Sequence, residues 1–486
     1  MLGTTTTSVA SRLESMRSAE SSLIEFARRF GEEGGGSADG PSGGIVQIET
    51  FDTEIPRSSV PLRGGGGDCL CGITGAGSDS FVIHGVKVTA ETAAPPAVTS
   101  ADAAPPLVLL HGYCNGCLYF YRNLVGLARR WRGPVYALDM LGWGLSSRPP
   151  FEPEAASDGS KGGGAVEGAE SFFVESLEAW REAKGLERMT LAGHSMGGYM
   201  AVAYSEKYPH RVDRLVLLSP VGVPDRRPEE EAKKYSNLPL RFKCMLSMFR
   251  YTWSKGITPG SFLRFLPESK GRSMAAGYVT NRLPAISSPE EREALTEYLY
   301  ANSMLPGSGE FCLDQVLEPG AFAKRPTLGR IPQIDVPSVG FIYGQSDWMD
   351  PMGGVEVRDI CDRINESRGE EHGKGGAPDV EVFGVKDAGH LLMLENWEGF
   401  NNAVLAAAGG DDYGENKVTG ETVTTTEMST TAASNEGRNW HERGYVRLTR
   451  NGELSSASEI FSVPRWSSDQ EEEGEKISTE VDPVGA

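Results

Sequence analysis

Short runs of almost continuous hydrophobic residues recur along the middle of the chain, and amphipathic stretches lie between them. Runs of this kind are typical of strands that are buried on both faces of a sheet. They occupy Pro106–His111, Val135–Asp139, Met189–Ala192, Leu215–Leu218, Val339–Tyr343 and Val380–Val385. The stretches with helical spacing are Leu118–Trp131, Ser171–Lys184 and Met196–Lys207. This alternation predicts an α/β fold, with a mostly parallel central sheet and helices on both of its faces.

Segments of other kinds interrupt and flank this pattern. An amphipathic helix is expected over residues 12–30, and a strand pair around Ser80–Ala90. Between Val223 and Pro332 the alternation stops, and the many aromatic residues and methionines there predict an inserted helical cap. Three Gly-rich patches are expected to be solvated loops. They lie at 33–44, 157–168 and 369–376.

These patterns predict five consecutive regions. They are an N-terminal helix with a Gly-rich linker (1–45), a first part of the core (46–222), the cap (223–332), a second part of the core (333–408) and an acidic tail (409–486). The tail is rich in Thr, Ser and Glu, so it buries too little apolar surface to offset its chain entropy. We expect it to be disordered.

Composition and net charge limit which partners and which cellular compartment we expect. The formal net charge of −20 over 486 residues argues against nucleic acid as a partner. Seven cysteines in so long a chain do not form a disulfide scaffold and favour a reducing compartment. The N-terminal segment is too acidic for a transit peptide, and no run approaches the ~20 apolar residues of a membrane span. We expect an intracellular protein, cytoplasmic or at a lipid droplet, a membrane surface or a mitochondrion.

The strongest chemical motif is Gly193-His194-Ser195-Met196-Gly197, placed between a predicted strand and a predicted helix. This is the context of a nucleophile elbow, in which a serine occupies a tight turn above the sheet. Gly193 and Gly197 keep neighbouring backbone from colliding with that turn. The helix that begins at Met196 directs its N–H groups towards the reacting oxygen.

Partners for the serine follow in the order of an α/β-hydrolase, first an acid and then a histidine. Asp347 follows the strand that ends near Tyr343, and His390 follows the last strand. His390 is predicted to act as general base and acid, and Asp347 to orient it. Asp350 is an alternative acid three residues further on.

The loop His111-Gly112-Tyr113-Cys114-Asn115-Gly116 follows an earlier strand. The N–H groups of Tyr113 and Met196 are the predicted oxyanion hole. Cys114 and Cys117 form a C-x-x-C, but no second cysteine pair or histidine cluster offers further ligands. The sequence therefore predicts no metal site and no cofactor.

Several stretches resemble one α/β-hydrolase subfamily. It includes the coactivator of adipose triglyceride lipase, the N-acylphosphatidylethanolamine lipase, and plant and yeast lysophosphatidic acid acyltransferases and cardiolipin deacylases. The likeness rests on PLVLLHGY, PVYALDMLGWGLSSRP, GHSMGGY, LPGSGEFCLDQVLEPGAFAKRP and FIYGQSDWMD, and it spans roughly residues 80–405. It implies a nucleophile at Ser195, a base at His390 and an acid within the DWMD segment.

The resemblance leaves three functions open. The first is a lipase or phospholipase that cleaves acyl esters of lipids. The second is a lysophosphatidic acid acyltransferase with acyl-CoA as cosubstrate, although Glu395 replaces the Asp of the H-x-x-x-x-D motif linked to that activity. The third is a lipase coactivator at lipid droplets, a class that typically lacks the serine. In all three a lipid is the partner, and the basic, aromatic segment 239–253 is a candidate for contact with a membrane.

Overall fold

The computed structural model describes most of the chain in separate ranges. These are residues 8–33, 45–63, 79–90, 104–153, 163–226, 247, 251–252, 255–368, 376–409, 444–448 and 460–461. The proposed membrane segment 239–253 lies outside the described residues, apart from Ser247, Tyr251 and Thr252.

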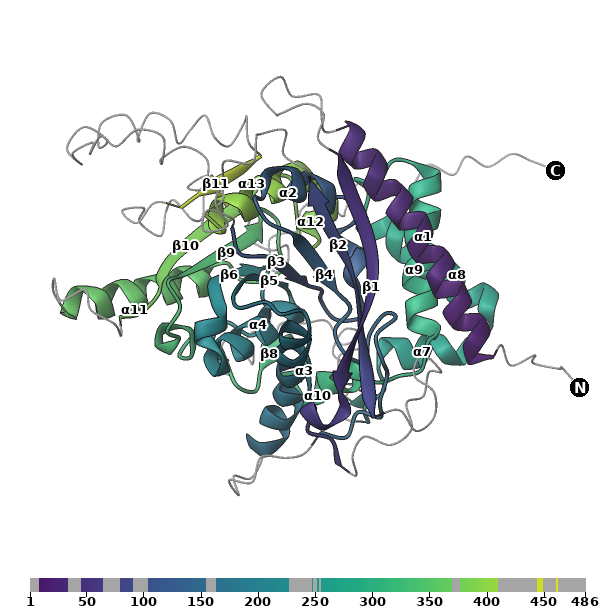
Figure 1. Cartoon of the computed structure of the whole chain (residues 1–486), viewed down its shortest axis with the longest axis horizontal. Coiled ribbons are helices and arrows are strands. Elements are labelled where there is room, and N and C mark those ends of the chain that lie inside the picture. Colours follow the sequence, from purple (N-terminus) through teal and green to yellow (C-terminus); the bar gives the residue numbers. More distant parts are fainter. Residues whose placement is uncertain are drawn as a thin grey trace, which may run out of the picture.

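A nine-stranded sheet runs through the centre of the molecule (Figure 1). Its strands are β1 (Val46–Pro56), β2 (Ser80–Ala90), β3 (Leu107–Leu110), β4 (Val135–Leu138), β5 (Met189–His194), β6 (Val212–Leu218), β9 (Ser338–Gly344), β10 (Asp379–Val385) and β11 (Tyr445–Arg447). Their order across the sheet is β1-β2-β4-β3-β5-β6-β9-β10-β11. Every pair from β4 to β10 is parallel, whereas β1, β2 and β11 join antiparallel. The predicted, mostly parallel α/β sheet is confirmed.

Helices cover both faces of this sheet, as the alternating pattern predicts. They are α1 (Val9–Glu33), α2 (Leu124–Arg130), α3 (Gly163–Ala183), α4 (Met196–Lys207), α7 (Pro259–Phe265), α8 (Glu268–Arg282), α9 (Pro289–Met304), α10 (Leu313–Val316), α11 (Met352–Arg368), α12 (Leu392–Glu395) and α13 (Trp397–Ala407). Side chains of α3, α4 and α11 form a core on one face. Side chains of α1, α2, α9 and α13 form a second core on the other face. None of the described helices is both long and apolar enough to cross a membrane.

Between β6 and β9 the described residues form α7, α8, α9 and α10 and a two-stranded ribbon of β7 (Leu317–Glu318) and β8 (Phe322–Ala323). Of these helices, α9 lies along α1 and α8 lies along α9 (Figure 1). Short 3-10 turns η2 (Arg57–Ser59), η4 (Cys117–Phe120), η5 (Pro209–Arg211), η6 (Gly309–Cys312) and η7 (Ile331–Gln333) connect the larger elements. Thus the N-terminal helix rests on the segment inserted between β6 and β9.

Two local predictions need correction. The expected strand pair around Ser80–Ala90 is a single strand, β2, which pairs antiparallel with the earlier segment Val46–Pro56 on one side and with β4 on the other. The Gly-rich patch 157–168 is not all loop, because α3 already begins at Gly163. Val166 and Ala169 are buried in line with Phe172 and Phe173, and this packing outweighs the low helix propensity of glycine.

The prediction of disorder after residue 409 is wrong for a few residues. Tyr445–Arg447 forms β11, which adds to the edge of the sheet beside β10. Tyr445, Leu448 and Phe461 are buried, and the ring of Phe461 packs edge to face against that of Tyr343, with 6.3 Å between the ring centroids. These apolar side chains give the segment the buried surface that its overall composition lacks.

Candidate active site

The nucleophile elbow lies between β5 and α4. Ser195 has φ 54° and ψ −115°, a backbone conformation that a non-glycine residue rarely adopts. The turn is held by the Ser195 N–H, which donates to the Leu218 carbonyl over 2.8 Å. A Cβ on Gly197 would lie 2.5 Å from the carbonyl oxygen of His111, and a Cβ on Gly193 would collide with the Gly197 carbonyl. Both glycines are therefore required by the close approach of backbone.

The predicted serine, histidine and acid lie in one hydrogen-bonded series. The Nε2 atom of His390 is 3.1 Å from Ser195 Oγ, and its Nδ1 atom is 3.1 Å from Asp347 Oδ1. The three side chains come from the ends of β5, β9 and β10, at the carboxyl edge of the sheet where open parallel sheets assemble their sites. All three are largely shielded from solvent.

The structure separates the two candidate acids. Asp347 is 3% exposed and faces His390. Asp350 is exposed and its Oδ1 accepts from the Met352 N–H over 3.0 Å, at the start of α11. The contact to the histidine therefore belongs to Asp347, while Asp350 caps a helix.

Electrostatics keep Asp347 ionised. Burial acts to raise the pKa of this carboxyl, but the charge and the hydrogen bond of His390 outweigh it, with help from Ser219 and the Met349 N–H. As a result the pKa of Asp347 is lowered from its usual 3.8. A carboxylate in this place stabilises an imidazolium on His390 and selects the tautomer with its proton on Nδ1.

The predicted oxyanion loop packs against the elbow. A Cβ on Gly112 would lie 3.2 Å from Ser195 Cβ, so the backbone at Gly112 is in close contact with the serine. Tyr113 is the next residue of the loop. His111 braces the loop, since its Nδ1 lies 2.7 Å from the Gly112 carbonyl and its Nε2 accepts from the Met140 N–H. Met196 is the residue after the serine and begins α4. The loop that carries Tyr113 thus packs against the elbow, and the N–H groups of Tyr113 and Met196 remain the predicted oxyanion hole.

Two side chains that the sequence did not single out as supports contact the backbone at or next to His390, the predicted base. His194 Nε2 donates to the backbone carbonyl of His390 over 2.9 Å, and the two rings are 4.9 Å apart. Burial lowers the pKa of His194 to about 3, so its ring is neutral. Glu395 accepts a hydrogen bond from the Gly389 N–H, next to His390. Glu395, which occupies the last position of the H-x-x-x-x-D motif, therefore contacts the loop that carries His390.

No sequence pattern marks these supports. His194 occupies the variable position of the G-x-S-x-G motif, and a side chain beside a nucleophile is expected to point away from it. The ring of Trp348 lies 5.0 Å from that of His390. In the sequence Trp348 stands out only as part of the DWMD segment, and nothing there indicates this contact. Contacts of this kind depend on how the loops after β5, β9 and β10 meet, which is a tertiary feature.

Comparisons with known proteins agree with this architecture. A family model described as the alpha/beta hydrolase fold matches residues 105–396. The chain is 34% identical over 311 residues to a 1-acylglycerol-3-phosphate O-acyltransferase of Arabidopsis thaliana, covering 63% of this chain and 67% of the relative. It is 33% identical over 303 residues to human 1-acylglycerol-3-phosphate O-acyltransferase ABHD5, covering 62% of this chain and 76% of the relative.

Two further similarities come from lipases and esterases. Human (lyso)-N-acylphosphatidylethanolamine lipase is 34% identical over 281 residues, which cover 55% of this chain and 73% of the relative. Among solved structures, carboxylesterase CesB from Bacillus subtilis is similar, with a TM-score of 0.44 and 18% identity, over 81% of this chain and 98% of that protein.

Proposed function

The chain belongs to the alpha/beta hydrolase fold family, and from this membership and the geometry around Ser195 we propose that it is a serine-dependent hydrolase of lipid acyl esters. The observation that carries the proposal is the series Asp347–His390–Ser195, with 3.1 Å at each step and the serine on a strained turn. The lipid substrate is suggested by the relatives, which are named for lysophospholipid acyl transfer and N-acylphospholipid cleavage.

The reaction would proceed through an acyl-enzyme. Ser195 Oγ attacks the ester carbonyl carbon while its proton passes to His390 Nε2. The oxyanion that forms accepts from the N–H groups of Tyr113 and Met196. When the intermediate collapses, the carbon–oxygen bond to the leaving alcohol breaks and His390 returns the proton to that alcohol. Water then repeats the sequence on the acyl-enzyme and releases a fatty acid and the free serine.

Acyl transfer to a lysophospholipid is the second candidate, because the two plant and animal relatives above are named for it. In that reaction acyl-CoA is the cosubstrate, and the hydroxyl of lysophosphatidic acid replaces water at the acyl-enzyme. A role as a lipase coactivator stands third, since an intact serine elbow serves no purpose in a protein that acts only through a partner.

Product analysis separates these functions. We would incubate the wild type and Ser195→Ala with labelled lysophosphatidic acid or phosphatidylcholine, with and without acyl-CoA. Hydrolysis predicts fatty acid release that is lost in Ser195→Ala and kept in Ser205→Ala. Ser205 is a buried serine on α4, the helix that follows the elbow, and its hydroxyl donates to the Ala201 carbonyl. Phosphatidic acid formed only with acyl-CoA would instead establish acyl transfer. Lipid turnover that is unchanged in Ser195→Ala would contradict both the hydrolase and the acyltransferase proposal.

We also propose that the protein meets its substrate at a lipid surface. Large hydrophobic side chains are exposed on α7 and α8, where Phe265 is 85%, Phe262 51% and Met274 48% exposed. Apolar side chains that face water in this way favour an interface. Phe262→Ser with Phe265→Ser should reduce co-sedimentation with phosphatidylcholine vesicles while leaving cleavage of a short, soluble ester unchanged. Unreduced co-sedimentation would contradict the proposal.

A further inference from the structure

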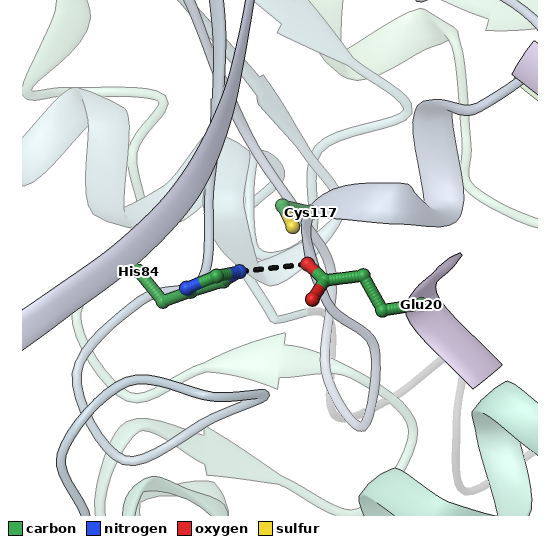
Figure 2. Close-up of side chains that lie close together, drawn as sticks. All are labelled: Glu20, His84 and Cys117. Atoms are coloured by element: carbon green, nitrogen blue, oxygen red, sulfur yellow. Dashed lines mark hydrogen bonds and ion pairs between the residues drawn. The ribbon is translucent and has the colours of Figure 1, made fainter. Parts of the chain in front are cut away.

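A second cluster of chemically active side chains lies apart from the triad. It joins Glu20 of α1, His84 of β2 and Cys117 of η4 (Figure 2). A carboxylate oxygen, a ring nitrogen and a sulfur of these residues all lie within 4.8 Å of one another. The three residues are 6%, 5% and 1% exposed, so the donor atoms converge inside the protein.

The donor set suits one class of ligand. Imidazole nitrogen, carboxylate oxygen and cysteine sulfur together favour a borderline-soft ion such as Zn²⁺ over Mg²⁺ or Ca²⁺, which prefer oxygen alone. Three protein ligands leave the fourth position of a tetrahedral site open. A cavity of about 520 Å³ is lined by Glu20 and His84, together with Asp52 and Arg17. This cavity gives an entry path and room for a water as the fourth ligand.

The orientation of His84 provides a second, independent argument. Its Nδ1 lies 2.7 Å from Asp52 Oδ1, and on the other side of the ring its Nε2 lies 2.7 Å from Glu20 Oε1, a contact that a bound metal would replace. Asp52 belongs to β1 and is not one of the three converging residues. A carboxylate that accepts from one ring nitrogen and leaves the other for a metal is the usual outer-shell partner of a zinc-bound histidine.

We propose that Glu20, His84 and Cys117 bind a zinc ion, with Asp52 orienting His84 and water from the cavity completing the coordination. Such an ion ties α1 and β2, which precede the part of the chain matched by the hydrolase family, to the turn that follows the oxyanion loop. Cys117 comes one residue after Gly116, so the ion anchors the far end of that loop. This site does not depend on the proposed lipid hydrolysis.

From the sequence we expect no metal here, because no further ligands lie near Cys114 and Cys117 along the chain. Glu20 and His84 lie 97 and 33 residues before Cys117, and no regular spacing connects them. The alternative to a metal site is an ion-pair cluster, in which the buried ring of His84 bridges the carboxylates of Glu20 and Asp52. The two interpretations differ in whether the thiol of Cys117 takes part.

Cobalt substitution tests the proposal directly, because a thiolate bound to Co²⁺ gives a charge-transfer band and a tetrahedral site gives intense visible bands. We would titrate the metal-free protein in a Cys69→Ser, Cys71→Ser, Cys244→Ser background, since those three cysteines lie outside the described residues. The expected result is one equivalent of Co²⁺ with both signals, displaced by Zn²⁺. The bands should vanish in Cys117→Ser and persist in Cys361→Ser, which alters another buried free cysteine.

A second variant keeps the proposal testable if Cys117→Ser does not fold. Asp52 has a side chain that is 54% exposed, so Asp52→Asn should fold while weakening metal affinity about tenfold to a hundredfold in equilibrium dialysis with Zn²⁺. An absence of cobalt bands in the starting protein would overturn the proposal. So would bands that survive Cys117→Ser, or an affinity that Asp52→Asn leaves unchanged.

Discussion

At the scale of single residues, the two acids of the DWMD segment differ sharply in burial and partner. Asp347 accepts from His390, whereas Asp350 caps α11. We expect Asp347→Asn to lower kcat for lipid ester hydrolysis by about 10³- to 10⁴-fold, because an amide selects the wrong imidazole tautomer and leaves the imidazolium unstabilised. Steady-state kinetics on the purified protein measure this loss.

Asp350→Asn is the matched control. It removes a charge three residues away and retains an oxygen that still accepts from the Met352 N–H, so kcat should stay within about twofold of the wild type. A large loss in Asp350→Asn together with a small one in Asp347→Asn would reverse the assignment of the acid.

The neutral, buried ring of His194 makes stability depend on pH. Burial and the neighbouring His390 lower the pKa of His194 to about 3, against 6.5 in an unfolded chain. Between these values the unfolded chain takes up a proton that the folded protein does not, so stability falls as pH drops below 6.5. This group alone should cost about 1 kcal/mol of unfolding free energy between pH 7.5 and 5.5.

Urea unfolding of His194→Gln at both pH values checks that expectation. Glutamine retains an N–H donor for the His390 carbonyl but takes up no proton, so the drop in stability should shrink by about that amount. An equal drop in both proteins would assign the acid sensitivity to another group. The lowered pKa of Asp347 does not account for a drop in this range, because its stabilising effect is lost only when the pH falls through the usual carboxyl value of 3.8 and below.

Where a motif and an order along the chain exist, the sequence points to residues that the structure brings together. Ser195 and His390 follow from the elbow and from the last strand. The choice between Asp347 and Asp350 did not follow, because both leave the same strand three residues apart. What decides it is the path of the turn after Gly344, which buries one carboxylate beside His390 and leaves the other in solvent.

At the scale of elements, the loop between β10 and α12 depends on Glu395. Burial raises the pKa of this carboxyl from 4.5, although the Gly389 N–H, Arg282 and His390 act in the opposite direction. Since the ionised form is the better acceptor for the Gly389 N–H, it is the form that holds the base loop. We expect Glu395→Gln to lower kcat about tenfold, and Glu395→Ala to lower it further.

The ratio of products distinguishes a structural support from a determinant of acyl transfer. If Glu395 only positions His390, hydrolysis and transfer to lysophosphatidic acid should fall together in Glu395→Gln, and Glu395→Asp should recover part of both. A change in the ratio of fatty acid to phosphatidic acid, with the sum preserved, would show that Glu395 selects the acceptor.

Elements differ in how far local pattern determines them. The central parallel strands are continuous apolar runs, so their places were predicted. β1 and β11 lie at the two edges of the sheet and are more polar, and β11 is only three residues long within an acidic segment. Its strand conformation depends on pairing with β10 and on the burial of Leu448 and Phe461, which no local pattern encodes.

At the scale of the whole molecule, one buried ion pair connects three parts of the fold. Arg122, between η4 and α2, pairs with Glu291 at the start of α9 through Nε and Nη2, at 2.7 and 2.8 Å. Its Nη1 donates to the Leu394 carbonyl of α12 over 2.9 Å. Both side chains are nearly inaccessible to solvent. The inserted segment is thereby linked to the helix that follows His390.

This arrangement predicts different effects on stability and on activity. Glu291→Gln leaves the Arg122 charge buried without its partner and should lower the free energy of unfolding by about 3 to 5 kcal/mol. Replacing both residues, as Arg122→Met with Glu291→Leu, removes the uncompensated charge and should recover most of that loss. The double variant nevertheless lacks the donor to the Leu394 carbonyl, so α12 is held less firmly and kcat should remain below that of the wild type. Urea unfolding and ester hydrolysis, both measured on the wild type, Glu291→Gln and the double variant, test these expectations. A double variant with both wild-type stability and wild-type kcat would mean that the pair joins the inserted segment to the core without supporting His390.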